Sequence, residues 1–306
     1  MVRFAVEDIG WDAFLEKFGH VTGLGDSGDP SAAVARLLTC VYQASANSSG
    51  TTREAARAVA GAVGARFLEF EIGELVDGFT RMVEGGLGRK MDWGRDDIAL
   101  QNIQARVRAP GVWMVANLQN ALLLATSNRS EAAVGYATMD GDTCGGLSPI
   151  AGIDKAFLRE WLQWLEKDGP EGVGPIPALA AVNRQAPTAE LRPRGSGQTD
   201  EGDLMPYPLL DAIERAAIRD KLSPCDVFDR MAGLFPEHGP ERLAAWIDRF
   251  FRLWCRNQWK RERYAPSFHL DDENLDPKTW CRFPILSGGF ETELESLSDR
   301  VGGGAS

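Results

Sequence analysis

The fold is decided by two stretches of sequence, Leu37-Leu38-Thr39-Cys40-Val41-Tyr42 and Arg66-Phe67-Leu68-Glu69-Phe70-Glu71-Ile72. The first is a short continuous apolar run, which predicts a buried strand, and the second alternates apolar and charged residues as a strand does. Between them Thr51 opens a helical pattern with Glu54 three residues later, a capping box, and this pattern ends at Gly64. The order strand, helix, strand predicts a βαβ unit and a parallel sheet.

Further elements are expected on both sides of this unit. Residues 3–18 predict a short helix, and residues 97–119 predict a long helix disturbed by the Pro-Gly pair at 110–111. The fully apolar run 121–125 predicts a second buried parallel strand. Residues 168–206 are rich in Pro, Gly, Gln and Thr and are typical of a long functional loop.

The remaining sequence is mostly helical. Helices are expected near 208–221, 224–234 and 240–260, and the residues at 302–306 predict a frayed tail. In the last of these helices the apolar residues recur at helical spacing, which predicts that one face lies in the core: Leu243, Trp246, Ile247, Phe250, Phe251 and Trp254.

Composition narrows the classes of function. The 306 residues carry a net charge of −11, so the protein as a whole repels nucleic acid and anionic membranes, and an anionic ligand needs a local basic site. Five cysteines without a C-x-x-C pair favour reduced thiols, which are typical of a cytoplasmic protein. No signal peptide or membrane-spanning run is expected, because no apolar stretch has the required length.

Two glycine-rich segments are weak candidates for phosphate binding. Residues 23–28 match G-x-G-x-x-G, but a helical pattern precedes them and the nearby acidic side chains would repel phosphate, so a surface loop is favoured. Ser287-Gly288-Gly289 follows an apolar run, but the Asp-Ser expected after such a loop is missing.

Residues 98–155 hold a denser set of polar side chains. Asn102 and Arg106 lie four residues apart and share a helix face. Thr126 and Glu131 follow the expected strand at 121–125, at the strand end where ligands bind in open α/β sheets. A hydroxyl and a carboxylate there suit a nucleotide with Mg²⁺, but a simple helix cap explains the same residues equally well.

Two further features concern cations. Lys155 stands at the start of a helix, against the helix dipole, so it is a candidate for binding an anion. Residues 249–263 form a local basic patch, for which we expect a solvated helix end rather than a nucleic-acid site, because nucleic acid would oppose the overall negative charge.

Several spaced runs occur in the order that a known family shows: 39–42 with 47–49, 100–106, 126–136, 145–150 with Lys155, 186–191, 198–201 and 257–260. Together they cover most of residues 35–290 and resemble the synthetase domain of NAD⁺ synthetases. The first pair of runs looks most like the long, glutamine-dependent form. The resemblance implies an α/β fold of the adenine-nucleotide α-hydrolase-like, ATP-pyrophosphatase type. In that fold a doubly wound parallel sheet is flanked by helices, and here a helical C-terminal part follows.

The resemblance also implies a reaction. ATP activates the nicotinate carboxylate of deamido-NAD⁺, which gives an adenylated intermediate and pyrophosphate, and ammonia then forms the amide of NAD⁺. This is the chemistry of a carbon-nitrogen ligase that uses ATP and Mg²⁺. The ammonia comes from glutamine, through a nitrilase-like glutaminase domain that the present sequence does not contain. A homo-oligomer, with neither nucleic acid nor a membrane as partner, is expected.

Site residues follow by matching position. Glu131 is expected to hold Mg²⁺ and, with Lys155, to act in catalysis. Thr126, Lys155 and Thr188 are expected to contact ATP. Arg106, Trp259 and Lys260 are expected to contact deamido-NAD⁺. Lys155 and Mg²⁺ suit the chemistry, because adenylyl transfer spreads negative charge over phosphate oxygens.

The sequence departs from the family in three places. Short forms carry Lys where Met139 stands and Asp where Gly146 stands. The S-G-G-x-D-S pyrophosphate loop and the first strand before it, normally in the middle of the sheet, are missing. We therefore expect residues 1–290 to form a synthetase domain incomplete at its N-terminus and 291–306 to be a C-terminal tail. The isolated chain should then be inactive or impaired. The alternative is an inactive nucleotide-binding or assembly subunit.

Overall fold

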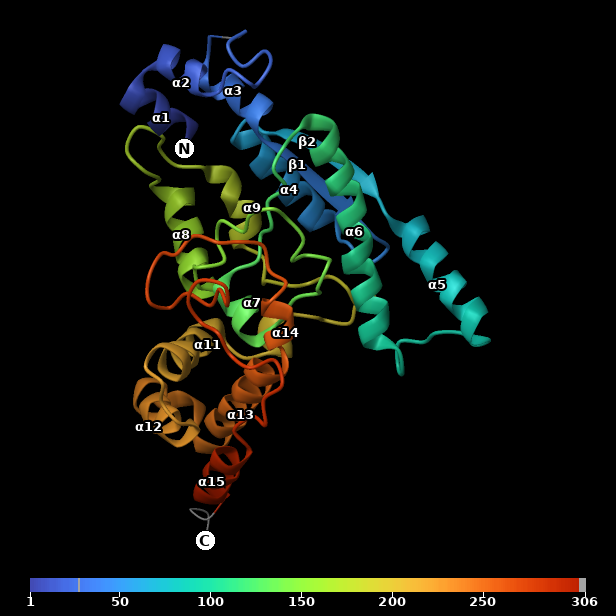
Figure 1. Cartoon of the computed structure of the whole chain (residues 1–306), viewed down its shortest axis with the longest axis vertical. Coiled ribbons are helices and arrows are strands. Elements are labelled where there is room, and N and C mark those ends of the chain that lie inside the picture. The colour runs from blue at the N-terminus through green and yellow to red at the C-terminus, as the bar shows by residue number, and fades with distance from the viewer. Residues whose placement is uncertain (27, 303–306) are drawn as a thin grey trace. The chain divides into compact units, whose positions relative to one another are not determined.

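The computed structural model describes residues 1–26 and 28–302 (Figure 1). Ser27, within the glycine-rich segment at 23–28, and positions 303–306 of the frayed tail expected over 302–306 lie outside the described residues. The chain divides into two compact units, which are described separately: unit 1 comprises 1–95, 159–186 and 190–197, and unit 2 comprises 96–158, 187–189 and 198–306. None of the helices in the described ranges has the length and apolarity needed to span a bilayer.

The βαβ prediction is confirmed in unit 1. Strands β1 (Thr39–Ala44) and β2 (Arg66–Glu71) pair in parallel with Thr39 opposite Arg66, and helix α4 (Gly50–Ala62) connects them (Figure 1). The first strand begins two residues later than predicted, because 37 still belongs to a preceding helix. It is also only half-buried along most of its length.

The start of α4 differs from the predicted capping box. Ser49, not Thr51, is the N-cap, and its hydroxyl accepts the Thr52 backbone N–H at 3.1 Å. Glu54 pairs with Arg57 one turn along instead of reaching back to the cap. Several nearby hydroxyl residues offer alternative caps, and Ser49 has the extended backbone that the N-cap position requires.

The other elements of unit 1 are helical. The single helix predicted over 3–18 is wrong, because Gly10, at φ +80°, separates two helices. Phe14 is fully buried, whereas Ile9 is exposed. The helices are α1 (Val2–Ile9), α2 (Trp11–Lys17), α3 (Pro30–Leu37), α5 (Gly73–Leu87), the later turns of α8 (Lys155–Lys167), η1 (Pro177–Leu179) and α9 (Ala180–Asn183).

Unit 2 is built around a helical core. Phe250 and Ile247 of α13 are fully buried, and every other position predicted for that helix face is buried too. The tail expected from 291 instead forms a helix, which places Leu294 and Leu297 in the same core. The helices are α6 (Asp97–Gln119), α7 (Arg129–Val134), the first turn of α8, α10 (Asp200–Asp203), α11 (Tyr207–Glu214), η2 (Arg215–Arg219), α12 (Pro224–Leu234), η3 (Pro236–His238), α13 (Pro240–Arg256), α14 (Gln258–Arg261) and α15 (Glu291–Gly302).

Two predictions for unit 2 fail. Helix α6 runs through Pro110 without a break. The buried strand predicted over 121–125 is reduced to a single parallel bridge between Leu124 and Leu147, and the side chains of Leu122 and Leu124 are 61% and 42% exposed. The apolar composition of this run correctly indicates a preference for burial. In the described part of unit 2, however, no element packs over Leu122 and Leu124.

Candidate functional site

The starts of α7 and α8 bring together the two residues that were expected to act in catalysis. The Lys155 ammonium donates a hydrogen bond to a carboxylate oxygen of Glu131 at 2.8 Å, and both side chains are largely buried. The Lys155 ammonium also lies 5.7 Å from the ring centre of Tyr207. The ion pair therefore sits in a partly desolvated setting, where charges interact more strongly than in water.

The structure bears out the helix-cap reading of residues 126–131. Asn128 is the N-cap of α7, and it and Glu131 form a capping box, because each side chain accepts the other's backbone N–H, at 3.0 and 3.3 Å. The cap reading is therefore confirmed for Glu131, and the cap also fixes the carboxylate that faces Lys155. Thr126 is exposed and lies outside the cap.

A second buried carboxylate belongs to the same surroundings. Asp200 is 5% exposed, and one of its oxygens accepts the Tyr207 hydroxyl at 2.9 Å. Within the described ranges its other oxygen has no hydrogen-bond partner. Burial raises the pKa of Asp200, and the positive charge of Lys155 opposes that rise. The Asp200 backbone N–H donates to Pro187 at 3.0 Å, so the segment that carries Thr188 is held beside this carboxylate.

The residues expected to contact deamido-NAD⁺ meet on the loop after α7. Arg106 donates to the Met139 carbonyl at 3.1 Å, and the Lys260 ammonium donates to the carbonyls of Gly135 and Ala137 at 2.7 and 2.8 Å. Burial lowers the pKa of Lys260, and Arg106 lies close enough to contribute to that shift. Trp259 is 40% exposed beside Lys260.

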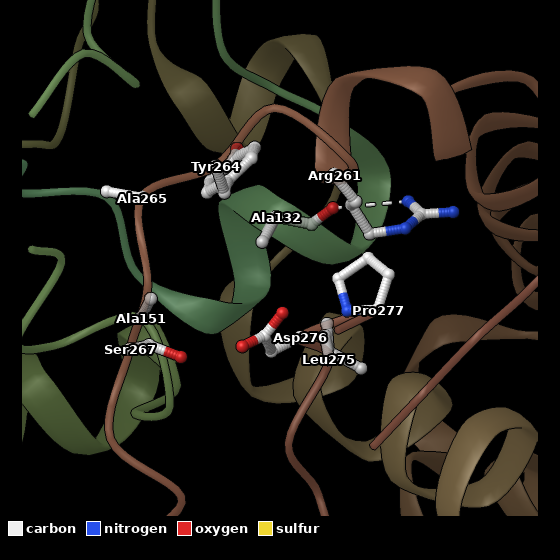
Figure 2. Close-up of a pocket in the computed structure, with 9 residues that line it drawn as sticks. All are labelled: Ala132, Ala151, Arg261, Tyr264, Ala265, Ser267, Leu275, Asp276 and Pro277. Atoms are coloured by element: carbon white, nitrogen blue, oxygen red, sulfur yellow. Dashed lines mark hydrogen bonds between the residues drawn. The ribbon is translucent and has the colours of Figure 1, made fainter. Parts of the chain in front are cut away.

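The C-terminal end of α7 is held by residues that follow α13. Arg261 is fully buried and donates to the carbonyls of Ala132 and Ala133, and Asn257 donates to that of Val134 at 2.7 Å. Figure 2 shows the Arg261 guanidinium directed at the Ala132 carbonyl, on the wall of a small pocket. These contacts satisfy carbonyls that a helix end otherwise leaves unpaired, so they fix the short helix that carries Glu131.

The N-terminal end of α7 is held by ion pairs of Arg129. Arg129 has only 4% of its side chain exposed and forms ion pairs with Glu273, Asp154 and Glu214 at 2.7, 3.0 and 3.0 Å. Sequence reasoning missed this cluster, because its members come from segments separated by up to 144 residues. Only the position of Arg129, two residues before Glu131, could have pointed to it.

Most of the predicted basic patch at 249–263 is engaged within the protein. Lys260 and Arg261 donate to carbonyls, as described above. Arg249 donates to the Leu204 carbonyl at 2.6 Å, Arg252 pairs with Asp248, and Arg263 pairs with Asp140. These contacts favour a structural role for the patch.

Comparisons with known proteins identify the family of this chain. The sequence matches the NAD synthase family over residues 31–249. The glutamine-dependent NAD(+) synthetase of Aquifex aeolicus is 35% identical over 251 residues, which cover 82% of this chain and 40% of that protein. The corresponding protein of Rattus norvegicus is 29% identical over 277 residues, covering 84% and 38%.

A solved structure gives a further likeness. The crystal structure of a glutamine-dependent NAD(+) synthetase from Cytophaga hutchinsonii superposes with a TM-score of 0.83 and 42% identity, over 97% of this chain and 48% of that one. The chain thus spans between about two fifths and about half of the length of the relatives it matches.

These findings define the class of the protein first: an α/β protein of the adenine-nucleotide α-hydrolase-like class, rich in helix and with a small parallel sheet. Within that class, the chain belongs to the NAD synthase family.

Proposed function

We propose that this chain carries out the synthetase step of NAD⁺ formation, the ATP-dependent amidation of deamido-NAD⁺ through an adenylated intermediate. The observation that carries the proposal is the Lys155–Glu131 pair, held at the starts of two helices in a family of NAD synthases. In this reading the protein is a carbon-nitrogen ligase. Its ammonia comes from glutamine, as in the relatives named glutamine-dependent, through a nitrilase-like glutaminase domain as partner.

The proposed roles divide between the two groups of side chains. Lys155 binds ATP with Thr126 and Thr188, and its ammonium neutralises charge that develops on the phosphate oxygens. Glu131 and Lys155 are the catalytic pair. The Asp200 backbone contact that holds the segment of Thr188 supports this grouping.

Glu131 fits a role in holding Mg²⁺. The described residues contain no group of three or more His, Cys, Asp or Glu side chains suited to a metal ion, so a site here would rest on fewer than three such side chains. Mg²⁺ is commonly held by one or two carboxylates together with substrate phosphates and water. The Glu131 oxygens accept from Lys155 and Asn128, and each retains a second lone pair. When bound, the metal would polarise the phosphate oxygens of ATP.

Arg106, Trp259 and Lys260 would recognise deamido-NAD⁺. The Lys260 ammonium spends two of its three N–H donors on the carbonyls of Gly135 and Ala137, which leaves one donor for a ligand. Arg106 keeps its terminal nitrogens beside the same loop while its Nε binds Met139. The partly exposed Trp259 ring beside the Lys260 ammonium suits a nicotinate ring with a carboxylate.

The finer account of the fold is also a proposal. We expect a doubly wound sheet that lacks its first strand, within a synthetase domain over residues 1–290. Exposed apolar side chains at Leu122 and Leu124 support a missing neighbour along that edge. A homo-oligomer is supported by the exposed apolar stripe of α5: Leu75, Phe79, Met82, Val83 and Leu87.

The test combines binding with turnover. Calorimetric titration should show that the chain binds Mg²⁺-ATP and deamido-NAD⁺. With ammonium added, NAD⁺ should form slowly, because the family's S-G-G-x-D-S loop is absent from this sequence. Lys155→Ala should reduce turnover by about 100-fold or more, the scale of losing a preorganised cation at a reacting phosphate.

The matched control is Lys90→Ala. This lysine is 85% exposed and pairs with Glu84, so its loss should leave binding and turnover unchanged. Failure to bind either ligand would overturn the proposal. Binding of both ligands without any amidation, even when the upstream segment with the S-G-G-x-D-S loop is supplied, would instead favour the alternative, an inactive nucleotide-binding or assembly subunit.

A further inference from the structure

The Asp211 carboxylate of α11 lies at the starts of both helices that carry the Lys155–Glu131 pair. One of its oxygens accepts the Ser130 hydroxyl at 2.5 Å, and the other accepts the Ala156 backbone N–H at 3.0 Å. Ser130 precedes Glu131 directly, and Ala156 follows Lys155 directly. The Ser130 oxygen in turn accepts the Lys155 backbone N–H at 2.8 Å. One carboxylate therefore ties the Ser130 side chain of α7 to the backbone of α8, at the positions next to the ion pair.

This carboxylate is costly to keep where it is. Asp211 is 6% exposed and Ser130 is fully buried. A buried charge loses hydration, which a well-packed apolar side chain would not, so stability alone does not explain its presence. What Asp211 supplies that an apolar residue cannot is two acceptors at fixed positions, each holding a different helix start.

The other charged groups near Asp211 that the structure describes do not accept the hydrogen bonds of Ser130 and Ala156. Arg129 forms its ion pairs with other acids, namely Asp154, Glu214 and Glu273. The Ser130 hydroxyl and the Ala156 backbone N–H thus donate to Asp211, whereas Arg129 forms no hydrogen bond or ion pair with Asp211 in the described ranges.

We propose that Asp211 is a positioning residue that sets the distance and orientation of Lys155 relative to Glu131 for the binding of Mg²⁺-ATP. It acts through Ser130 and the backbone of α8, and it touches no substrate. The inference rests on the proposed function of the Lys155–Glu131 pair in ATP binding.

The expected sensitivity follows from the geometry. A ligand bound by a lysine and a carboxylate from two different helices depends on their separation, and groups that orient such side chains typically change affinity or activity by about 10- to 100-fold when lost. The ligand deamido-NAD⁺ is assigned to Arg106, Trp259 and Lys260, which form no hydrogen bond or ion pair with Asp211 in the described ranges. Loss of Asp211 should therefore affect the two ligands unequally.

The experiment compares Asp211→Asn with the unaltered chain by calorimetry at pH 8, with Mg²⁺-ATP and deamido-NAD⁺ titrated separately. Asparagine keeps the volume of Asp211 but offers one acceptor oxygen, so one helix start loses its partner. We expect ATP affinity to fall by about tenfold and deamido-NAD⁺ affinity to stay within about twofold. Asp248→Asn, which removes an exposed carboxylate paired with Arg252, is the matched control and should leave both affinities unchanged.

Ser130→Ala is the second variant, because it removes the same hydrogen bond from the other side without placing a new donor in the core. It should weaken ATP binding in the same selective way, and it decides the matter if Asp211→Asn does not fold. Unchanged ATP affinity in a folded variant overturns the positioning role. An equal fall in affinity for both ligands, accompanied by a fall in thermal stability, also overturns it. A merely structural role for Asp211 predicts that pattern.

The outcomes separate this inference from the proposed function. If the unaltered chain binds ATP and the variants bind it equally well, only the positioning role fails. If the unaltered chain does not bind ATP, the proposed function fails and the inference falls with it.

Discussion

Two apolar regions of unit 2 differ in burial. Helix α13 spaces its apolar residues at helical intervals, and the whole predicted face, including Phe250 and Ile247, is buried. The run at 121–125 is apolar at every position, yet Leu122 and Leu124 are exposed. Helix α13 packs against α11, α12 and α15, whereas Leu124 has one bridge to Leu147. Apolar composition therefore indicates that a segment prefers burial, but burial also requires other elements that pack against it.

The largest expected effect comes from the buried side of this comparison. Phe250→Ala removes a fully buried ring that contacts Phe251 edge-on at 5.6 Å between ring centres. It should lower the free energy of unfolding by about 3–5 kcal/mol, which is the usual cost of emptying such a site. Urea unfolding followed by circular dichroism would measure it. A loss below about 1 kcal/mol would show that α13 is not part of a tightly packed core.

The polar side of the same core should make stability depend on pH. Burial raises the pKa of Asp211 from 3.8 to about 7 and also raises that of Glu214. The facing groups are Asp154 and Arg129, of which the first raises and the second lowers the pKa of Asp211. Because the folded chain holds these protons more tightly than the unfolded chain, unfolding releases protons between about pH 4 and pH 7.

The free energy of unfolding should therefore fall as pH rises through that window, by a few kcal/mol, since one pKa unit corresponds to about 1.4 kcal/mol. Denaturant unfolding at pH 5 and pH 8 measures the fall, and Asp211→Asn, which cannot titrate, should make it smaller. Acids that the fold stabilises as anions have the opposite effect: the Asp220 pKa is lowered to about 2, so its contribution is lost only at lower pH. Equal pH dependence in both proteins would show that Asp211 titrates normally.

The same contrast explains how much the sequence could predict. The βαβ unit and the core face of α13 follow from local periodicity, and both are confirmed. The Lys155–Glu131 pair could be named by resemblance, but its contact was not visible in a sequence where the residues lie 24 positions apart. Asp211 and Arg129 escaped notice because their partners lie far along the chain, and a lone acid or arginine in a helix carries no local signal.

The smallest expected effect on stability concerns the exposed apolar run at 121–125. Leu124→Thr replaces a side chain that is 42% exposed with a β-branched polar one that still suits an extended backbone, so the bridge to Leu147 can persist. The free energy of unfolding should change by less than about 0.5 kcal/mol, as at most surface positions. Aggregation at high concentration should decrease, because an exposed apolar edge is a template for pairing with other chains. Light scattering during concentration measures the second effect, and Thr126→Val, which extends the apolar run at an exposed neighbouring position, should increase it. A destabilisation of 2 kcal/mol or more by Leu124→Thr, the scale of a buried leucine, would mean that this run is covered in solution and that its contrast with α13 disappears.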